Sequence, residues 1–186
     1  MEKSKVYTLE ALAGSQLENC SRETLIALLA TWARLYLVLD GYWYLAVKQR
    51  FGDDQAVDLD LQVWDKQTRK EIEELVKVMD FPNRDVVSLM ELMAVMPSAA
   101  GSKGYLEVKD RDDCLLSITY CPIVRTLERE GQGREKTQCR VICRRIMTAM
   151  TLSFNPGIEV KPIRMPPRQN QDEVYCQWQF KLKGGQ

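Results

Sequence analysis

Cysteine and aspartate are the residues of this chain whose types and positions could do chemistry. Six cysteines occur among 186 residues, and the chain contains no histidine, which is the commonest metal ligand and general base. Cys139 and Cys143 lie one helical turn apart, so both thiols can share one face of a helix. Such thiols could be small core residues, metal ligands or nucleophiles.

A four-thiolate metal site is one hypothesis. Cys139 and Cys143 would supply two ligands, and Cys121 and Cys176 would complete a tetrahedral site for zinc or iron. The C-x2-C spacing that is usual in structural zinc sites is absent from the sequence. A purely structural role in the core therefore stays open beside metal binding, because free cysteine is often a small buried residue.

Cys121 or Cys139 could instead act as a nucleophile. Without histidine, the activating base would have to be Asp, Glu, Lys or Tyr, unless a helix N-terminus or a nearby cation lowers the thiol pKa. Cys139 is expected in the first turn of a helix with Arg140 beside it. This setting would favour the thiolate.

Asp40 is a carboxylate near the middle of the longest apolar stretch, residues 25–47. Tyr36, Trp43 and Tyr44 stand at i−4, i+3 and i+4 from it and would share its face of a helix. They could donate hydrogen bonds to the carboxylate or wall a pocket around it. We expect Asp40 to be a structural acceptor, or a pocket carboxylate with a raised pKa that acts as a base or binds a cationic ligand.

The helices that position these residues follow from apolar periodicity. Residues 21–50 are predicted to form one long helix that is apolar on nearly all sides. Arg34 and Asp40 near its middle argue against a membrane span, so we expect a central helix buried in the protein. Residues 54–79 are predicted as an amphipathic helix and the Met-rich residues 86–97 as a third helix.

After residues 98–102 the apolar spacing changes to the period of two that is typical of strands. The predicted elements are strands at 105–108 and 114–121, which form a hairpin, a helix at 138–154, and strands at 158–163 and 174–182. In the last strand, Cys176 and Trp178 share the inward face. The order predicts an α+β fold: three N-terminal helices, then a four-stranded, mostly antiparallel sheet with one further helix between its strand pairs.

Length and composition fit one soluble domain over residues 1–186, with an N-terminal extension (1–20), a helical part (21–97) and a sheet part (102–183). Lys plus Arg and Asp plus Glu balance at 26 each and are interleaved, so we expect no nucleic-acid partner. The N-terminus lacks the continuous apolar region of a secretory signal. We therefore expect cytoplasmic localisation and no membrane association.

Several short motifs resemble a known group of proteins. They are LDGYWYLAVKQRFG (39–52), Val63-Trp64 with Glu71, Cys121-Pro122, Cys139, NPGIEV (155–160) and DEVYCQWQF (172–180). Together they resemble an uncharacterised group of cytosolic prokaryotic proteins, and we expect a bacterial protein. That group is similar to the L-2-amino-thiazoline-4-carboxylate hydrolase-like proteins. The resemblance implies roles for Asp40, Trp43, Cys121, Cys139 and Cys176. Cys114 and Cys143 do not match its pattern.

These observations predict a protein that binds a small molecule or a metal between the long helix and the cysteine-bearing helix and sheet. The predicted ligand-binding residues are Tyr36, Asp40, Trp43, Tyr44 and Trp178, and the predicted metal ligands are Cys121, Cys139, Cys143 and Cys176.

Two other functions are alternatives to binding. The resemblance implies a hydrolase of a small cyclic amide or thiazoline, with Asp40 as base or with Cys121 or Cys139 as nucleophile. An interaction subunit would use the Met-rich helix at 86–97 against a partner protein. The partners that we expect are a small-molecule ligand and further copies of the chain in a homo-oligomer.

Overall fold

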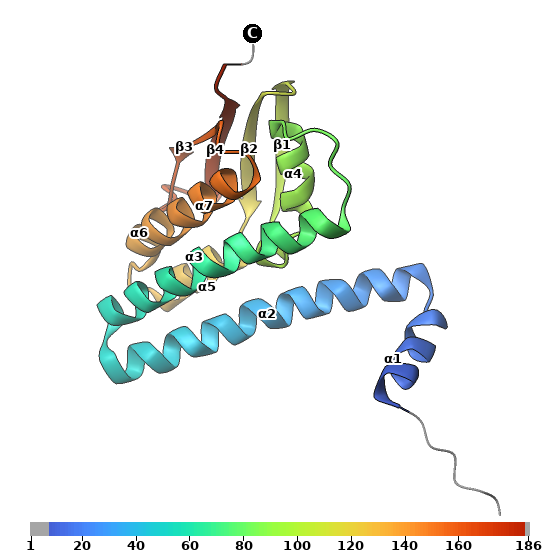
Figure 1. Ribbon diagram of the computed structural model, residues 1–186. Coiled ribbons are helices and arrows are strands. Elements are labelled where there is room, and N and C mark those ends of the chain that lie inside the picture. The colour runs from blue at the N-terminus through green and yellow to red at the C-terminus, as the bar shows by residue number, and fades with distance from the viewer. Residues whose placement is uncertain (1–7, 185–186) are drawn as a thin grey trace, which may run out of the picture.

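The computed structural model describes residues 8–184 and confirms the α+β class (Figure 1). Its α-helices are α1 (Leu9–Glu18), α2 (Arg22–Phe51), α3 (Asp53–Val78), α4 (Val86–Val95), α5 (Pro122–Glu130), α6 (Glu135–Gln138) and α7 (Arg144–Phe154). A 3-10 turn, η1 (Pro97–Ala99), and a π-helical turn, η2 (Cys139–Cys143), complete the helices. The strands are β1 (Lys103–Asp110), β2 (Asp113–Tyr120), β3 (Ile158–Arg164) and β4 (Cys176–Leu182).

The four strands form one antiparallel sheet in the order β1-β2-β4-β3. The predicted hairpin is confirmed, with Leu106 opposite Leu116. On β4, Trp178 and Phe180 are fully buried, as the alternation of the sequence predicts. The helices cover this face, so the core lies between the sheet and the helical layer.

Helix α4 lies inside this core. Its residues Val86, Leu89 and Leu92 are fully buried, and Met90 and Met93 are each 7% exposed. The hypothesis that the Met-rich helix offers a free surface to a partner is therefore wrong. Its methionines instead fill space against the sheet, which suits a flexible, unbranched side chain.

Helices α2 and α3 form an antiparallel hairpin. The helices meet at Gly52, whose φ of 90° is a conformation that favours glycine and allows the sharp reversal. Ser21 caps the start of α2 by accepting a hydrogen bond from the backbone N–H of Thr24 at 3.2 Å. Figure 1 shows α3 between α2 and the rest of the fold, so α2 is the outermost long helix.

The prediction that α2 is buried in protein is wrong. Tyr44 is the one buried residue of α2, and none of the most apolar 18-residue window of the helix is buried. By length and composition alone, with a mean hydropathy of 1.4 in that window, α2 could cross a membrane. The physical reason for the error is that α4 and α7, not α2, cover the sheet, so α2 packs mainly against the outer side of α3 and the turn η1.

The predicted helix at 138–154 is interrupted. Its first part is the π-helical turn η2, which carries both Cys139 and Cys143, and regular α-helix resumes at Arg144. Helix α5, which was not predicted, begins directly after β2 with Pro122 in its first turn and ends at Gly131. This helix places Cys121 at the end of the sheet, next to the π-helical turn.

Candidate functional site

Two carboxyl groups meet between the long helices. Asp40 of α2 and Asp60 of α3 lie close enough to influence each other's pKa, and the side chain of Trp64 lies beside both. The helical spacing explains the meeting, because Tyr36, Asp40 and Tyr44 form a row at i, i+4 and i+8 on the face of α2 that packs on α3. We call Asp40 and Asp60 the acid pair.

The acid pair holds a proton at pH values at which an isolated aspartate would have lost it. Burial raises the pKa of Asp40, and burial together with the charge of Asp40 raises the pKa of Asp60 to about 7. Two neighbouring carboxylates repel each other, so the pair is most stable when it shares one proton. Both side chains remain partly exposed.

Aromatic rings stand beside the acid pair. Tyr36 and Trp64 pack edge to face, with ring centroids 5.9 Å apart and an interplanar angle of 86°. Burial and the charges of Glu71 and Asp40 raise the pKa of the Tyr36 phenol. The predicted neighbourhood of Tyr36 and Asp40 is therefore present, and Trp64 of α3 lies where Trp43 was expected.

Further along α3, polar groups are buried without complete hydrogen bonding. Glu71 is 7% exposed, and its Oε2 accepts a hydrogen bond from Ser98 Oγ at 2.9 Å. Within residues 8–184, its other oxygen has no hydrogen-bond partner, and neither does Oγ1 of the fully buried Thr68. Burial raises the pKa of Glu71, so carboxyls with raised pKa values extend along the α2–α3 interface.

Tyr44 belongs to a different network. Its hydroxyl donates to Asp53 Oδ1 at 2.9 Å and accepts a hydrogen bond from the side-chain amide of Gln138. The guanidinium of Arg134 lies 4.6 Å from the centre of its ring and forms an ion pair with Glu130 at 2.5 Å. Tyr44 therefore joins α2 and α3 to α6 and is separate from the acid pair.

The two predicted tryptophans also lie away from the acid pair. Trp43 is 67% exposed on the outer side of α2, and Trp178 is fully buried in the sheet core. The indole Nε1 of Trp178 donates to Cys176 Sγ at 3.3 Å. Of the predicted ligand-binding residues, the structure brings together Tyr36 and Asp40, and it places Trp43, Tyr44 and Trp178 elsewhere.

The predicted cysteines gather beside the acid pair. Cys139 and Cys143 lie side by side, and Cys143 is near Cys176, Cys121 and Asp60. Burial raises the pKa of Cys121 to about 11 and that of Cys176 to about 12, and contact with Cys139 raises the pKa of Cys143 well above its usual value. We call Cys121, Cys139, Cys143 and Cys176 the thiol cluster.

The thiol cluster contains the four predicted metal ligands. Among residues 8–184, no group of three or more cysteine, aspartate or glutamate side chains is placed to hold a metal ion. Cys121, Cys143 and Cys176 all favour the neutral thiol. The cluster packs instead against apolar neighbours, which are Val124, Leu127, Met165 and Tyr175.

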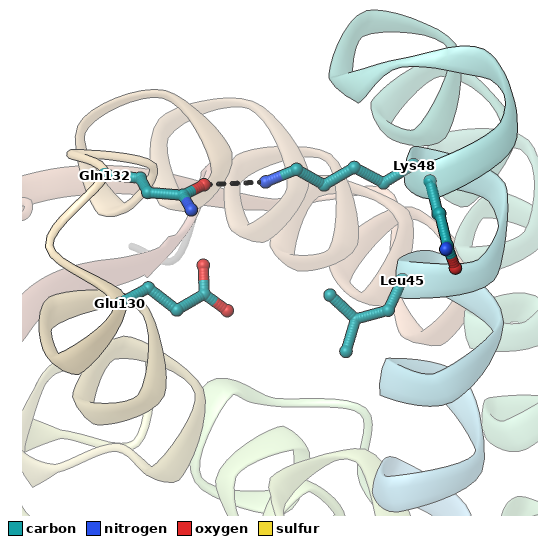
Figure 2. Close-up of a pocket in the computed structure, with 5 residues that line it drawn as sticks. Leu45, Lys48, Glu130 and Gln132 are labelled. Carbon is teal, nitrogen blue, oxygen red and sulfur yellow. Dashed lines mark hydrogen bonds between the residues drawn. The ribbon is translucent and has the colours of Figure 1, made fainter.

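Two depressions of the described surface lie elsewhere. One of about 440 Å³ is lined by Leu45, Lys48, Gln49, Glu130 and Gln132. Figure 2 shows Lys48 Nζ reaching across its mouth to Gln132 Oε1, at 2.9 Å. A second, of about 320 Å³, is lined by Arg140, Arg144, Pro162, Ile163 and Met165. Neither depression is lined by a residue predicted from the sequence to bind ligand.

Sequence reasoning missed Asp60. The signal was available, because Asp60 stands one turn before Trp64 and next to Leu61 in a helix whose apolar stripe includes both. A carboxylate beside a buried stripe of an amphipathic helix is as anomalous as Asp40 in its apolar helix. The partnership of the two required knowledge of how α2 and α3 pair.

No curated protein and no solved structure matches this chain. A family model does match: a family of unknown function, DUF6125, over residues 18–182. The match spans both long helices, the thiol cluster and the sheet. The chain therefore belongs to DUF6125.

Proposed function

We propose that this protein is a cytoplasmic binding module for a small organic cation, such as an ammonium or amidinium compound, and that the acid pair receives the cationic group. The observation that carries the proposal is that Asp40 and Asp60 face each other, partly exposed, with a pKa of about 7 for Asp60. A cation would take the place of the shared proton and relieve the repulsion between the two carboxylates.

The surroundings suit such a ligand. The rings of Tyr36 and Trp64 can contact a cation through their π faces, and the thiol cluster supplies an apolar side near Asp60. An N–H-bearing cation can also donate to both carboxylates at once, and hydrogen bonds between charged groups are stronger than those between neutral ones.

The test is a thermal-shift and calorimetric titration with benzamidinium and benzylammonium as probes. We expect wild-type protein to be stabilised by both, and Asp60→Asn or Asp40→Asn to bind about 10- to 100-fold more weakly, because a charge-assisted hydrogen bond is lost. Asp58→Asn is the matched control, since Asp58 is exposed on the same helix, where Gln62 donates to it at 3.0 Å. Equal binding by all four proteins would refute the proposal.

Hydrolysis of a thiazoline is the second candidate function, and the pKa of about 7 at Asp60 favours it. A carboxyl that titrates near neutral pH can act as a general base toward water. The amino-thiazoline ring also carries an amidine-like group of the kind that the acid pair would bind. The raised pKa of Cys121 disfavours it as the nucleophile, and Cys139 is 3% exposed, so the acid pair is the better candidate for catalysis.

The same proteins separate the two functions. If the protein is a hydrolase, wild type turns over L-2-amino-thiazoline-4-carboxylate, Asp60→Asn loses this activity, and Cys121→Ser keeps it. Binding of the probes without turnover would support the binding module alone.

A further inference from the structure

The outer face of α2 exposes an unusual number of large apolar side chains. Trp32, Leu35, Leu39, Tyr42 and Trp43 are between 50% and 68% exposed. The charged residues of α2 between positions 24 and 47 are Arg34 and Asp40, and Asp40 faces α3. This face is therefore long, apolar and uncovered by the rest of the described chain.

The apolar residues follow the spacing of a coiled coil. They alternate in steps of three and four residues along one stripe: Leu25, Leu28, Trp32, Leu35, Leu39, Tyr42 and Ala46. This heptad pattern forms a seam that packs against another helix. Asp40 and Tyr44, which face α3, lie outside the stripe, so α2 has one side for α3 and another for a second partner.

The exposed area is of the size that a stable interface needs. The rings of Trp32, Tyr42 and Trp43, each more than half exposed, together present about 400 Å². The leucines of the stripe add to this area. The sum lies near the upper end of the roughly 300–600 Å² that the largest apolar patch of a typical monomer covers, and it approaches the roughly 800 Å² that each partner buries in a standard interface.

We infer that two copies of this chain dimerise through α2, with the two α2 helices antiparallel and a two-fold axis near Leu35. Leu35 stands at the middle of the stripe, so an axis there pairs the stripe along its whole length. Antiparallel packing also opposes the two helix dipoles. The paired hairpins then form a four-helix layer, in which Trp43 packs at the interface.

A second copy fits this face better than a lipid bilayer does. Asp40, Tyr36 and Tyr44 bind α3 from the same helix, and α3 carries exposed ion pairs such as Lys70 with Glu74 at 2.6 Å. A membrane-spanning α2 would have to give up its contacts with α3 or bring these charges into the hydrocarbon. A dimer covers the stripe and keeps every one of these contacts.

Sedimentation velocity and light scattering of the full chain test the inference. We expect wild type to have twice the mass of one chain and Leu35→Glu, or the Leu35→Glu, Leu39→Glu double variant, to have the mass of one chain. Leu152→Glu is the matched control, because Leu152 is also 50% exposed but lies on α7, and it should remain dimeric. Circular dichroism establishes that each variant is folded.

Three outcomes would overturn the inference. Wild type could be a monomer that does not associate, or Leu35→Glu could remain dimeric, which would place the interface elsewhere. Wild type could also be a monomer that floats with phosphatidylcholine vesicles while Leu35→Glu does not, and α2 would then be a membrane-binding surface. Vesicles are therefore included with each protein.

Discussion

At the scale of single residues, the proton held by the acid pair should make stability depend on pH. The pKa of Asp60 is about 7 in the folded protein, whereas an aspartate in an unfolded chain titrates near 4. Unfolding therefore releases a proton between about pH 4 and 7, so the contribution of Asp60 to stability falls as the pH rises through this window. The slope is at most about 1.4 kcal/mol per pH unit.

Asp60→Asn should remove this dependence, since asparagine has no proton to release. Urea unfolding at about pH 5, 6, 7 and 8 measures the free energy of unfolding of wild type and variant. The stability of the variant relative to wild type should increase up to about pH 7 and then level off. The groups facing Asp60 are Asp40, Trp64 and Cys143, and all are unchanged in the variant. Parallel stability curves for the two proteins would contradict the assignment.

The cysteines should differ in their reactivity. The pKa of Cys121 is about 11, so only about one molecule in a thousand carries the thiolate of Cys121 at pH 8. The side chains of Cys114 and Cys139 are only 1% and 3% exposed. We expect an aromatic disulfide reagent to label Cys20 quickly and the other five cysteines only after unfolding.

The control for this labelling experiment is Cys20→Ser. Cys20 lies just beyond α1, away from the thiol cluster, so the substitution should remove the fast reaction without affecting the other cysteines. A fast thiol that persists in Cys20→Ser would show that the thiol cluster contains a reactive cysteine. It would restore the nucleophile hypothesis.

At the scale of elements, two glycines should respond oppositely to alanine. A Cβ at Gly104 of β1 would collide with the carbonyl oxygen of Ser117 in the paired strand, and a backbone atom in a sheet moves little. We expect Gly104→Ala to destabilise the protein by about 1–3 kcal/mol. Gly41 of α2 has nothing within 4 Å of such a Cβ, so Gly41→Ala should stabilise the helix by about 0.5–1 kcal/mol. Thermal unfolding of both variants measures the contrast, and equal shifts would contradict it.

At the scale of the whole molecule, the proposed dimer should make stability depend on protein concentration. If two copies pair along this helix, folding and association are coupled, and the midpoint of thermal unfolding should rise with protein concentration. In Leu35→Glu it should be independent of concentration. A wild-type midpoint that does not move with concentration would argue against the dimer.

Much of the fold was determined by the sequence alone. Alternation by two placed Cys176 and Trp178 on the inward face of the sheet, and helical spacing identified α2, α3 and α4. These features depend on neighbours along the chain, which the sequence displays directly. Helix α5 was not predicted because its apolar pattern is short. The π-helical turn η2 was not predicted because its apolar pattern is continuous with that of the helix that follows.

Only the tertiary structure decided which apolar helix is covered and which residues form a site. Both α2 and α4 are strongly apolar, yet α4 is buried and α2 is exposed. The acid pair, likewise, joins residues on two different helices, and the thiol cluster draws on β4, the turn η2 and the start of α5. The physical reason is that periodicity shows which face of an element is apolar, whereas burial, pKa shifts and contacts depend on which other element packs against that face.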